Sequence, residues 1–101
     1  MRKKFTIEYL PIAQNDLLNI FEYIFLDNPS AAEQFVNKID KSILKLESFP
    51  ELGVVPKDDR LGLLGYRMLV IDNYLAFYVI KDQIIEIRRI IHGKRKFSFL
   101  L

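Results

Sequence analysis

The sequence of 101 residues contains no cysteine and a single histidine, His92. Without cysteine the chain can form no disulfide and offers no thiolate ligand, and one imidazole alone does not make a structural zinc site. No apolar run approaches the roughly 18 to 20 residues that a membrane-spanning helix needs. The charged start of the chain also lacks the apolar run of a signal peptide. We therefore expect a cytoplasmic protein without a membrane segment, a metal or another cofactor.

The composition is that of one folded domain. Hydrophobic residues make up 50% of the chain, which is enough for a core at this length. Leu, Ile, Val and Phe are too frequent for a disordered chain. There are no internal repeats and no low-complexity segments, so residues 1–101 are predicted to form a single domain.

The basic residues gather at the two ends of the chain. Residues 2–4 and 88–96 together hold eight of the 15 basic residues and none of the 13 acidic ones. Residues 5–87 hold the other seven basic residues and all 13 acidic ones. A positive patch of this kind on a small domain indicates an acidic or polyanionic partner.

The first half of the chain has the pattern of one strand followed by two helices. Residues 5–9 alternate between apolar and polar side chains, which is the period of a half-buried strand. Apolar residues recur at helical spacing over residues 13–24 and again over 32–46. Asn28 and Pro29 form a suitable cap and first residue for the second helix. The connection is short, so the two helices should form an antiparallel hairpin.

The second half is predicted to form three strands. A loop over residues 51–65 is followed by strand-like runs at 66–71, 74–80 and 84–91. Asp72 and Asn73 both tolerate positive φ and suit a two-residue hairpin turn. That turn pairs the last residue of the first run, Ile71, with Tyr74, and therefore also pairs Arg67 with Tyr78.

This register, with a three-residue loop at 81–83, assigns side chains to two faces. One face is apolar and should be the core beneath the helices: Met68, Val70, Leu75, Phe77, Val79, Ile85 and Ile87. The other should be open: Arg67, Tyr74, Ala76, Tyr78, Glu86 and Arg88. Arg67, Tyr78 and Glu86 would line up across it, with His92 near Tyr74. The predicted fold is α+β of order β-α-α-β-β-β, with a helical hairpin on one face of a mainly antiparallel sheet.

Six short motifs occur in order along this pattern: Ala13-x-x-Asp16-Leu17-x-x-Ile20-x-x-Tyr23-Ile24, Asn28-Pro29-x-Ala31-Ala32-x-x-Phe35, Leu46-x-x-Phe49-Pro50-x-x-Gly53, Gly65-Tyr66-Arg67-x-Leu69, Asn73-Tyr74-Leu75-x-x-Tyr78 and Arg89-Ile90-Ile91-His92-Gly93-Lys94-Arg95. Together they resemble the RelE/ParE superfamily of bacterial toxins, the toxin halves of type II toxin–antitoxin modules. The resemblance covers almost the whole chain. The first motif and the Ala31-Ala32 pair are closer to the ParE branch.

The resemblance implies the partners and two different activities. RelE-like members cut mRNA in the ribosome, whereas ParE-like members poison DNA gyrase without a recognised active site. Family antitoxins wrap a partly disordered region around the toxin. The implied partners are thus a cognate antitoxin, in a toxin–antitoxin hetero-oligomer, and either gyrase or the ribosome with its mRNA.

If the chain is a nuclease, its catalytic residues would be Arg67, His92 and Arg95. Metal-free RNA cleavage needs a base, an acid and cations at the phosphate. His92 has the only side chain whose ordinary pKa lies near neutral, and the two arginines would supply cations. Two departures favour the ParE branch instead. Leu75 stands where RelE-like nucleases have an arginine, and residues 96–101 lack their tyrosine.

We therefore expect a ParE-like toxin that inhibits growth through DNA gyrase and is neutralised by direct antitoxin binding. The alternatives are a RelE-like, ribosome-dependent mRNA endonuclease and a non-toxic antitoxin-binding module. Whether the chain is an enzyme stays open, with the missing groups arguing against it. The apolar residues 97–101 would either pack on the sheet or help to form an antitoxin groove. Five residues are the candidates for binding the target or a nucleic acid: Arg67, Tyr78, Arg88, Lys94 and Arg95.

Overall fold

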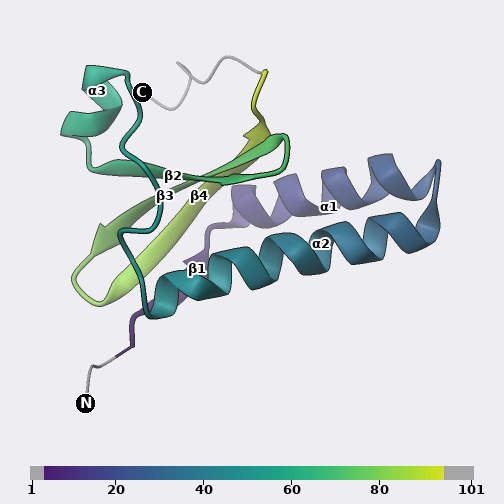
Figure 1. Cartoon of the computed structure of the whole chain (residues 1–101), viewed down its shortest axis with the longest axis horizontal. Helices are drawn as coiled ribbons and strands as arrows, with labels where there is room; N and C mark the ends of the chain where they lie inside the picture. Colours follow the sequence, from purple (N-terminus) through teal and green to yellow (C-terminus); the bar gives the residue numbers. More distant parts are fainter. Residues whose placement is uncertain (1–3, 95–101) are drawn as a thin grey trace.

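Residues 4–94 are described by a computed structural model, in which a pair of long helices packs on a four-stranded sheet (Figure 1). The elements, in chain order, are β1 (Thr6–Tyr9), α1 (Pro11–Phe25), α2 (Pro29–Leu44), α3 (Asp59–Leu63), β2 (Tyr66–Ile71), β3 (Tyr74–Lys81) and β4 (Ile84–His92). A single 3-10 turn, Lys45–Glu47, extends α2. The predictions for Arg95 and for residues 97–101 fall outside the described residues.

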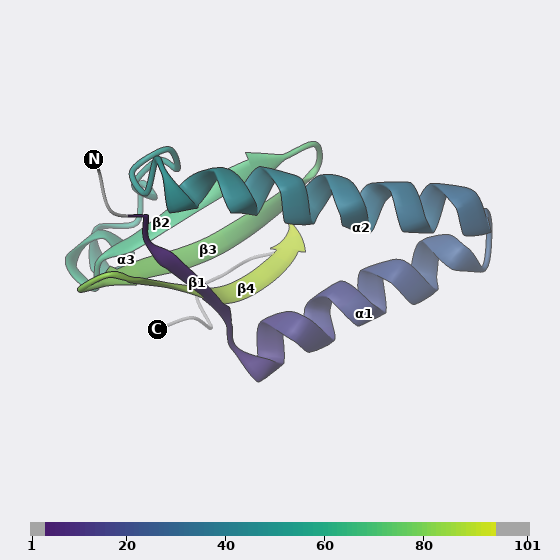
Figure 2. The same ribbon diagram turned by 90° about the horizontal axis from the view of Figure 1, so that it is seen from below.

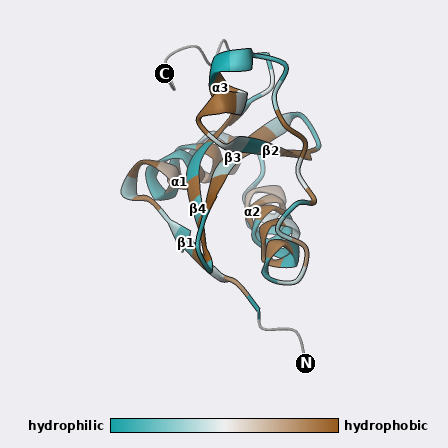
Figure 3. Ribbon diagram, turned by 90° about the vertical axis from the view of Figure 1, so that its left-hand side faces the viewer, coloured by the Kyte–Doolittle hydropathy of each residue, from teal (hydrophilic) through white to brown (hydrophobic). Residues whose placement is uncertain are grey.

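The helical hairpin was predicted correctly, and its ends show why. Pro11 and Pro29 are each the first residue of a helix, where a missing N–H costs nothing. The side chain of Asn28 caps α2 by accepting a hydrogen bond from the Ala31 N–H at 3.2 Å. Both helices mix hydrophilic and hydrophobic residues along their length, as amphipathic helices do (Figure 3). No helix within residues 4–94 is both long and apolar enough to cross a membrane.

The sheet is mixed, with strand order β1-β4-β3-β2. β1 runs parallel to β4, and the remaining neighbours are antiparallel. The hairpin between β2 and β3 has the predicted register, because Asp72 adopts a φ of 52° in the turn and Ile71 pairs with Tyr74. The α+β class and the hairpin on the sheet are confirmed.

The prediction of which sheet face lies beneath the long helices was wrong. The main core joins the two helices to the face that carries Tyr78 and Ala76, and both of these side chains are fully buried. Residues 76–79 of β3 are buried on both faces, so polar–apolar alternation could not select one. The opposite face has its own smaller core: Leu61, Tyr66, Phe77, Val79 and Ile91.

A short helix that the sequence analysis assigned to a loop closes this second face. α3 begins after Asp58, whose carboxylate accepts hydrogen bonds from the backbone N–H groups of Arg60 and Leu61 at 2.9 and 3.4 Å. The fully buried side chain of Leu61 belongs to the smaller core. The loop region thus supplies the apolar cover for the face with Phe77 and Val79, which was expected to lie beneath the long helices.

The register between β3 and β4 also differs from the prediction. The turn has two residues rather than three, with Asp82 at a φ of 54°, so Lys81 pairs with Ile84 and Glu86 pairs with Val79 instead of Tyr78. A β-bulge follows between Phe77 and Tyr78. Ile85 and Ile87 consequently lie in the main core beneath the helices, on the face opposite to Phe77.

Candidate functional site

Tyr78 has a structural position rather than an open one. Its side chain is fully buried, and its hydroxyl donates a hydrogen bond to the Pro50 carbonyl at 2.7 Å and accepts one from the Gly53 N–H at 2.9 Å. Burial raises its pKa, although the Gly53 N–H and the charge of Arg67 oppose this rise. The Tyr78 hydroxyl therefore holds the loop at residues 50–53 in place by hydrogen bonds and is not exposed to a binding partner.

Arg67 fastens the same loop. Its guanidinium donates from Nη1 to the carbonyl oxygens of Gly53 at 2.7 Å and Glu51 at 3.3 Å. It lies directly opposite Tyr78 in the sheet, as predicted. Because Glu86 pairs with Val79, the predicted line of Arg67, Tyr78 and Glu86 across one face does not exist.

The structure does not bring Arg67 and His92 together. Arg67 lies opposite Tyr78, whereas His92 lies opposite Tyr74. Four residues of strand separate these positions by about 13 Å along β3. Arg95, the third nuclease candidate, lies outside the described residues. No acid–base pair is therefore assembled around a common phosphate position by the described candidates.

His92 and Lys94 form the exposed end of β4. His92 Nδ1 accepts a hydrogen bond from the Lys94 N–H at 3.1 Å, and its ring lies edge-on to Tyr74 with centroids 5.3 Å apart. The Gly93 N–H donates to the Asn73 carbonyl at 2.8 Å and so ties this end to the β2–β3 turn. A hollow of about 400 Å³ lies beside it and is lined by Val70, Asp72, Asn73, Leu75, His92, Gly93 and Lys94.

A second cluster of charges surrounds Arg88. The Arg88 guanidinium donates to Glu86 at 2.9 Å and lies over the ring of Tyr66, 5.7 Å from its centroid. Lys81 approaches the same carboxylate at 3.4 Å. Burial raises the pKa of Glu86, but the Arg88 hydrogen bond and the Lys81 charge outweigh it and hold that pKa below its ordinary value. Glu86 is thus an ion-pair partner and a poor general base, and the cluster keeps one net positive charge.

Asp16 is the residue that sequence reasoning missed. It lies on the buried stripe of α1, three residues after Ala13 and four before Ile20. Its carboxylate accepts two hydrogen bonds from Arg89, at 2.8 and 3.0 Å, and a third from the Ile90 N–H at 2.9 Å. The Asp16 hydrogen bonds raise the pKa of Arg89. An acidic residue within an apolar stripe is the sequence signal that indicates such a buried partner.

Asp16 contacts β4 just beyond the point where the pairing between β4 and β1 ends. β1 pairs with β4 only as far as Tyr9 and Ile87, and the chain then turns into α1. Asp16 supplies an acceptor just beyond that point, next to the bulge that precedes the basic end of β4. The ion pair from α1 therefore fixes the segment that leads to His92 and Lys94.

Five residues form a candidate binding surface, which we call the β4-end surface: Val70, Leu75, Arg88, His92 and Lys94. It combines the cations of Arg88 and Lys94 with the apolar side chains of Val70 and Leu75 on the sheet face opposite the long helices. His92 borders this surface beside Tyr74, which packs against the main core. Among the described residues no three His, Asp or Glu side chains cluster as ligands for a metal ion. The chemistry of the surface suits electrostatic and apolar contact with a macromolecule.

Comparison with known proteins gives a family match and two similar solved structures. A sequence model of the family described as "ParE toxin of type II toxin-antitoxin system, parDE" matches residues 7–97. A solved structure of the chromosomal ParDE system from P. aeruginosa is similar with a TM-score of 0.75 and 21% identity, over 88% of this chain and 96% of that one. The RelBE2 toxin–antitoxin complex from Mycobacterium tuberculosis is similar with a TM-score of 0.54 and 20% identity, over 88% and 98%. No curated protein sequence matched. At these identities the two structures show a shared fold.

Proposed function

The chain belongs to the ParE toxin family of type II toxin–antitoxin systems, and on that premise we propose that it inhibits growth through DNA gyrase and is neutralised by direct binding of a cognate antitoxin. The observation that carries the proposal is the ParE family match over residues 7–97. Both similar solved structures are described as toxin–antitoxin systems or complexes, which supports an antitoxin partner. Action on gyrase would take place in the cytoplasm, where the chromosome lies.

Polar side chains of the sheet are held by contacts within the fold, which supports a toxin that acts by binding its target rather than by catalysis. Arg67 is held by loop carbonyls, and Glu86 is held by two cations. Leu75 packs against the smaller core at the position where RelE-like nucleases have an arginine. We therefore assign the β4-end surface to contact with the gyrase–DNA complex, to which its cations are complementary.

Inducing the chain without its antitoxin distinguishes the proposed target from the ribosome. Poisoned gyrase leaves broken DNA, so we expect an SOS response before protein synthesis declines. The measurement is an SOS-promoter reporter followed together with pulse-labelled protein synthesis. An immediate stop in translation with cleaved transcripts and a silent reporter would instead support an mRNA nuclease.

Lys94→Glu is expected to weaken gyrase inhibition about tenfold, because it reverses a charge on the proposed contact surface. The measurement is the toxin concentration that halves plasmid supercoiling by purified gyrase. Lys57→Glu is the matched control, since it makes the same charge change at an exposed lysine outside the β4-end surface. Equal inhibition by the two variants would remove Lys94 from the contact surface.

A further inference from the structure

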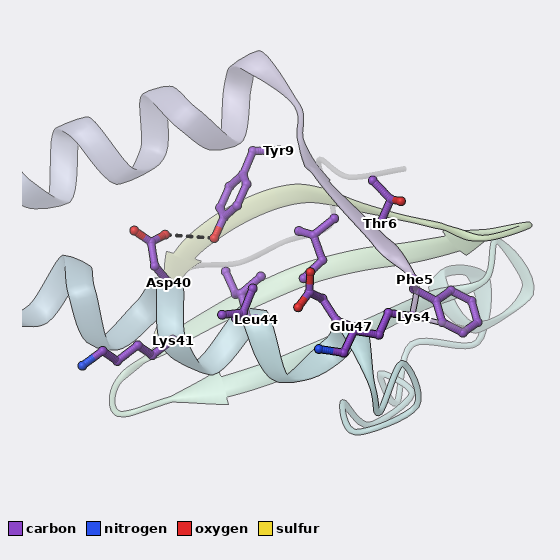
Figure 4. A pocket seen from close by; sticks show the side chains of 10 residues that line it. Lys4, Phe5, Thr6, Tyr9, Asp40, Lys41, Leu44 and Glu47 are labelled. Atoms are coloured by element: carbon purple, nitrogen blue, oxygen red, sulfur yellow. Dashed lines mark hydrogen bonds between the residues drawn. The ribbon is translucent and has the colours of Figure 1, made fainter. Parts of the chain in front are cut away.

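A groove of about 710 Å³ lies between β1 and the end of α2, away from the β4-end surface (Figure 4). The two long helices diverge from their connecting turn, and β1 crosses the open space between their far ends (Figure 2). The residues lining the groove are Lys4, Phe5, Thr6, Ile7, Tyr9, Asp40, Lys41, Ile43, Leu44 and Glu47. They come from the first strand and from the C-terminal half of α2 with its 3-10 turn.

The groove reaches the outer edge of β1. Phe5, Thr6 and Ile7 all line it, although consecutive strand residues point to opposite faces of a sheet. A hollow over one face alone would not be lined by all three. β1 is also the terminal strand of the sheet, with β4 on its other side.

Within residues 4–94, Ile7 in the middle of this edge has backbone groups without a hydrogen-bond partner. The N–H groups of Thr6 and Leu10 bond to Gln83 and Ile87 on the β4 side, so in a parallel ladder the backbone of Ile7 points outward. At each end of the outer edge one backbone group is already paired, because the Phe5 N–H donates to the Glu47 carbonyl and the Tyr9 carbonyl accepts from the Gln14 side chain.

The hydrogen bond from Phe5 to Glu47 is 3.0 Å long, and the one from Gln14 to Tyr9 is 3.3 Å long. Between them, no hydrogen bond within residues 4–94 reaches Ile7 from outside the sheet. Its N–H and C=O therefore form a two-point docking site for one residue of an added strand.

The groove is lined mainly by apolar surface, and a hydrogen bond joins its two walls at one end. Leu44 is 56% exposed, and Phe5 and Ile7 are half-buried. The Tyr9 hydroxyl donates to Asp40 at 2.9 Å across the groove, which joins β1 to α2 at one end (Figure 4). Burial, together with this hydrogen bond to a carboxylate, raises the pKa of Tyr9 above its usual range. Tyr9 therefore keeps the hydroxyl proton that it donates in this hydrogen bond throughout the physiological pH range.

The helix beside the groove presents a row of lysines. Lys38, Lys41 and Lys45 follow one another at helical spacing, and a second hollow that they line shares Lys41 with the groove. Lys38 is paired with Asp72 at 2.7 Å, whereas Lys41 and Lys45 make no ion pair within the described part of the chain. The lining of the groove itself is balanced, with Lys4 and Lys41 against Asp40 and Glu47. The positive charge available to an acidic residue of a partner lies along α2, at Lys41 and Lys45.

We propose that the groove binds an extended segment of the antitoxin, which adds as a strand to the outer edge of β1. The segment would pair with the backbone of Ile7, place an apolar side chain against Leu44 and carry acidic residues opposite Lys41 and Lys45. This assignment rests on the proposed function, because its occupant is the neutralising partner. It separates the antitoxin site from the β4-end surface assigned to the target.

Leu44→Glu tests the side-chain contact. The probe is the full-length cognate antitoxin, with affinity measured by calorimetry. We expect the variant to bind about tenfold more weakly or worse, because a charge replaces an apolar contact. Leu18→Glu is the matched control, a similarly exposed helical leucine (52%) that does not line this groove, and its affinity should stay within about twofold of the wild type. Unchanged thermal midpoints show that both variants are folded.

Hydrogen exchange tests the added strand. Binding should slow exchange of the Ile7 amide, whereas the Glu8 amide, already bonded to β4, should change little. Suppose that Leu44→Glu binds the antitoxin as tightly as the wild type and that binding does not slow exchange of the Ile7 amide. The groove assignment is then overturned, while the proposed function stands. Weakened binding without Ile7 protection overturns the strand geometry. If the wild-type chain does not bind the antitoxin at all, the proposed function itself fails.

Discussion

Replacing Asp16 with alanine is expected to lower the free energy of unfolding by about 3 to 5 kcal/mol. The side chains of Asp16 and Arg89 are only 10% and 13% exposed, so removing the carboxylate takes away the opposite charge and the two hydrogen bonds that Asp16 supplies to a largely buried cation. The Ile90 N–H loses its acceptor in the same step. The measurement is urea unfolding followed by circular dichroism, with the m-value checked for two-state behaviour.

Two controls separate the buried pair from a general effect of removing charge. Lys38→Ala breaks a surface pair whose side chains are 56% and 48% exposed, so it should cost less than about 1 kcal/mol. The double variant Asp16→Ala/Arg89→Leu should recover part of the loss, because it also removes the largely buried charge that Asp16 neutralised. A loss below about 1 kcal/mol in Asp16→Ala would show that this ion pair does not hold β4 to α1.

Gly53→Ala is expected to destabilise the fold by about 2 to 3 kcal/mol. A Cβ at this position would lie 2.7 Å from both Cε1 and the hydroxyl of Tyr78, and 2.9 Å from the Met68 carbonyl oxygen. The backbone cannot easily withdraw, because Val54 exchanges two hydrogen bonds with Met68, at 2.9 and 2.8 Å. The added methyl must therefore displace Tyr78 from the loop that its hydroxyl fastens.

Gly62→Ala is the matched control for this glycine. Its Cβ would meet only Val55 Cγ1 at 3.4 Å, and the residue lies within α3, where alanine is favoured over glycine by up to about 1 kcal/mol. Thermal unfolding of the two variants should therefore shift the midpoint in opposite directions or leave Gly62→Ala unchanged. Equal midpoints for both variants would contradict the tight packing of Tyr78 against Gly53.

The elements that depend on local chemistry were predictable from the sequence. Asn28 with Pro29 starts α2, and Asp72 sets a two-residue turn that fixes the register of β2 against β3. The family resemblance also indicated the fold and the ParE branch, which the family match confirms. These features are decided within a few residues of the chain.

The features that depend on distant contacts were not predictable in the same way. Tyr78 and Ala76 looked like an open face because their alternation is ambiguous on a strand buried on both sides. The one-residue shorter turn at Asp82 reversed the side on which Glu86 lies. The partner of Asp16 is 73 residues away, so the sequence could indicate a buried acid but not Arg89 as its counter-charge.

The most direct test of the proposed target is a cleavage assay with purified DNA gyrase and supercoiled plasmid. At micromolar toxin, we expect linear DNA to accumulate after detergent and protease treatment, because the gyrase–DNA cleavage complex is trapped. Prior addition of the antitoxin should prevent this accumulation. Normal supercoiling and no linear DNA at the same toxin concentration would contradict the assignment of gyrase as the target.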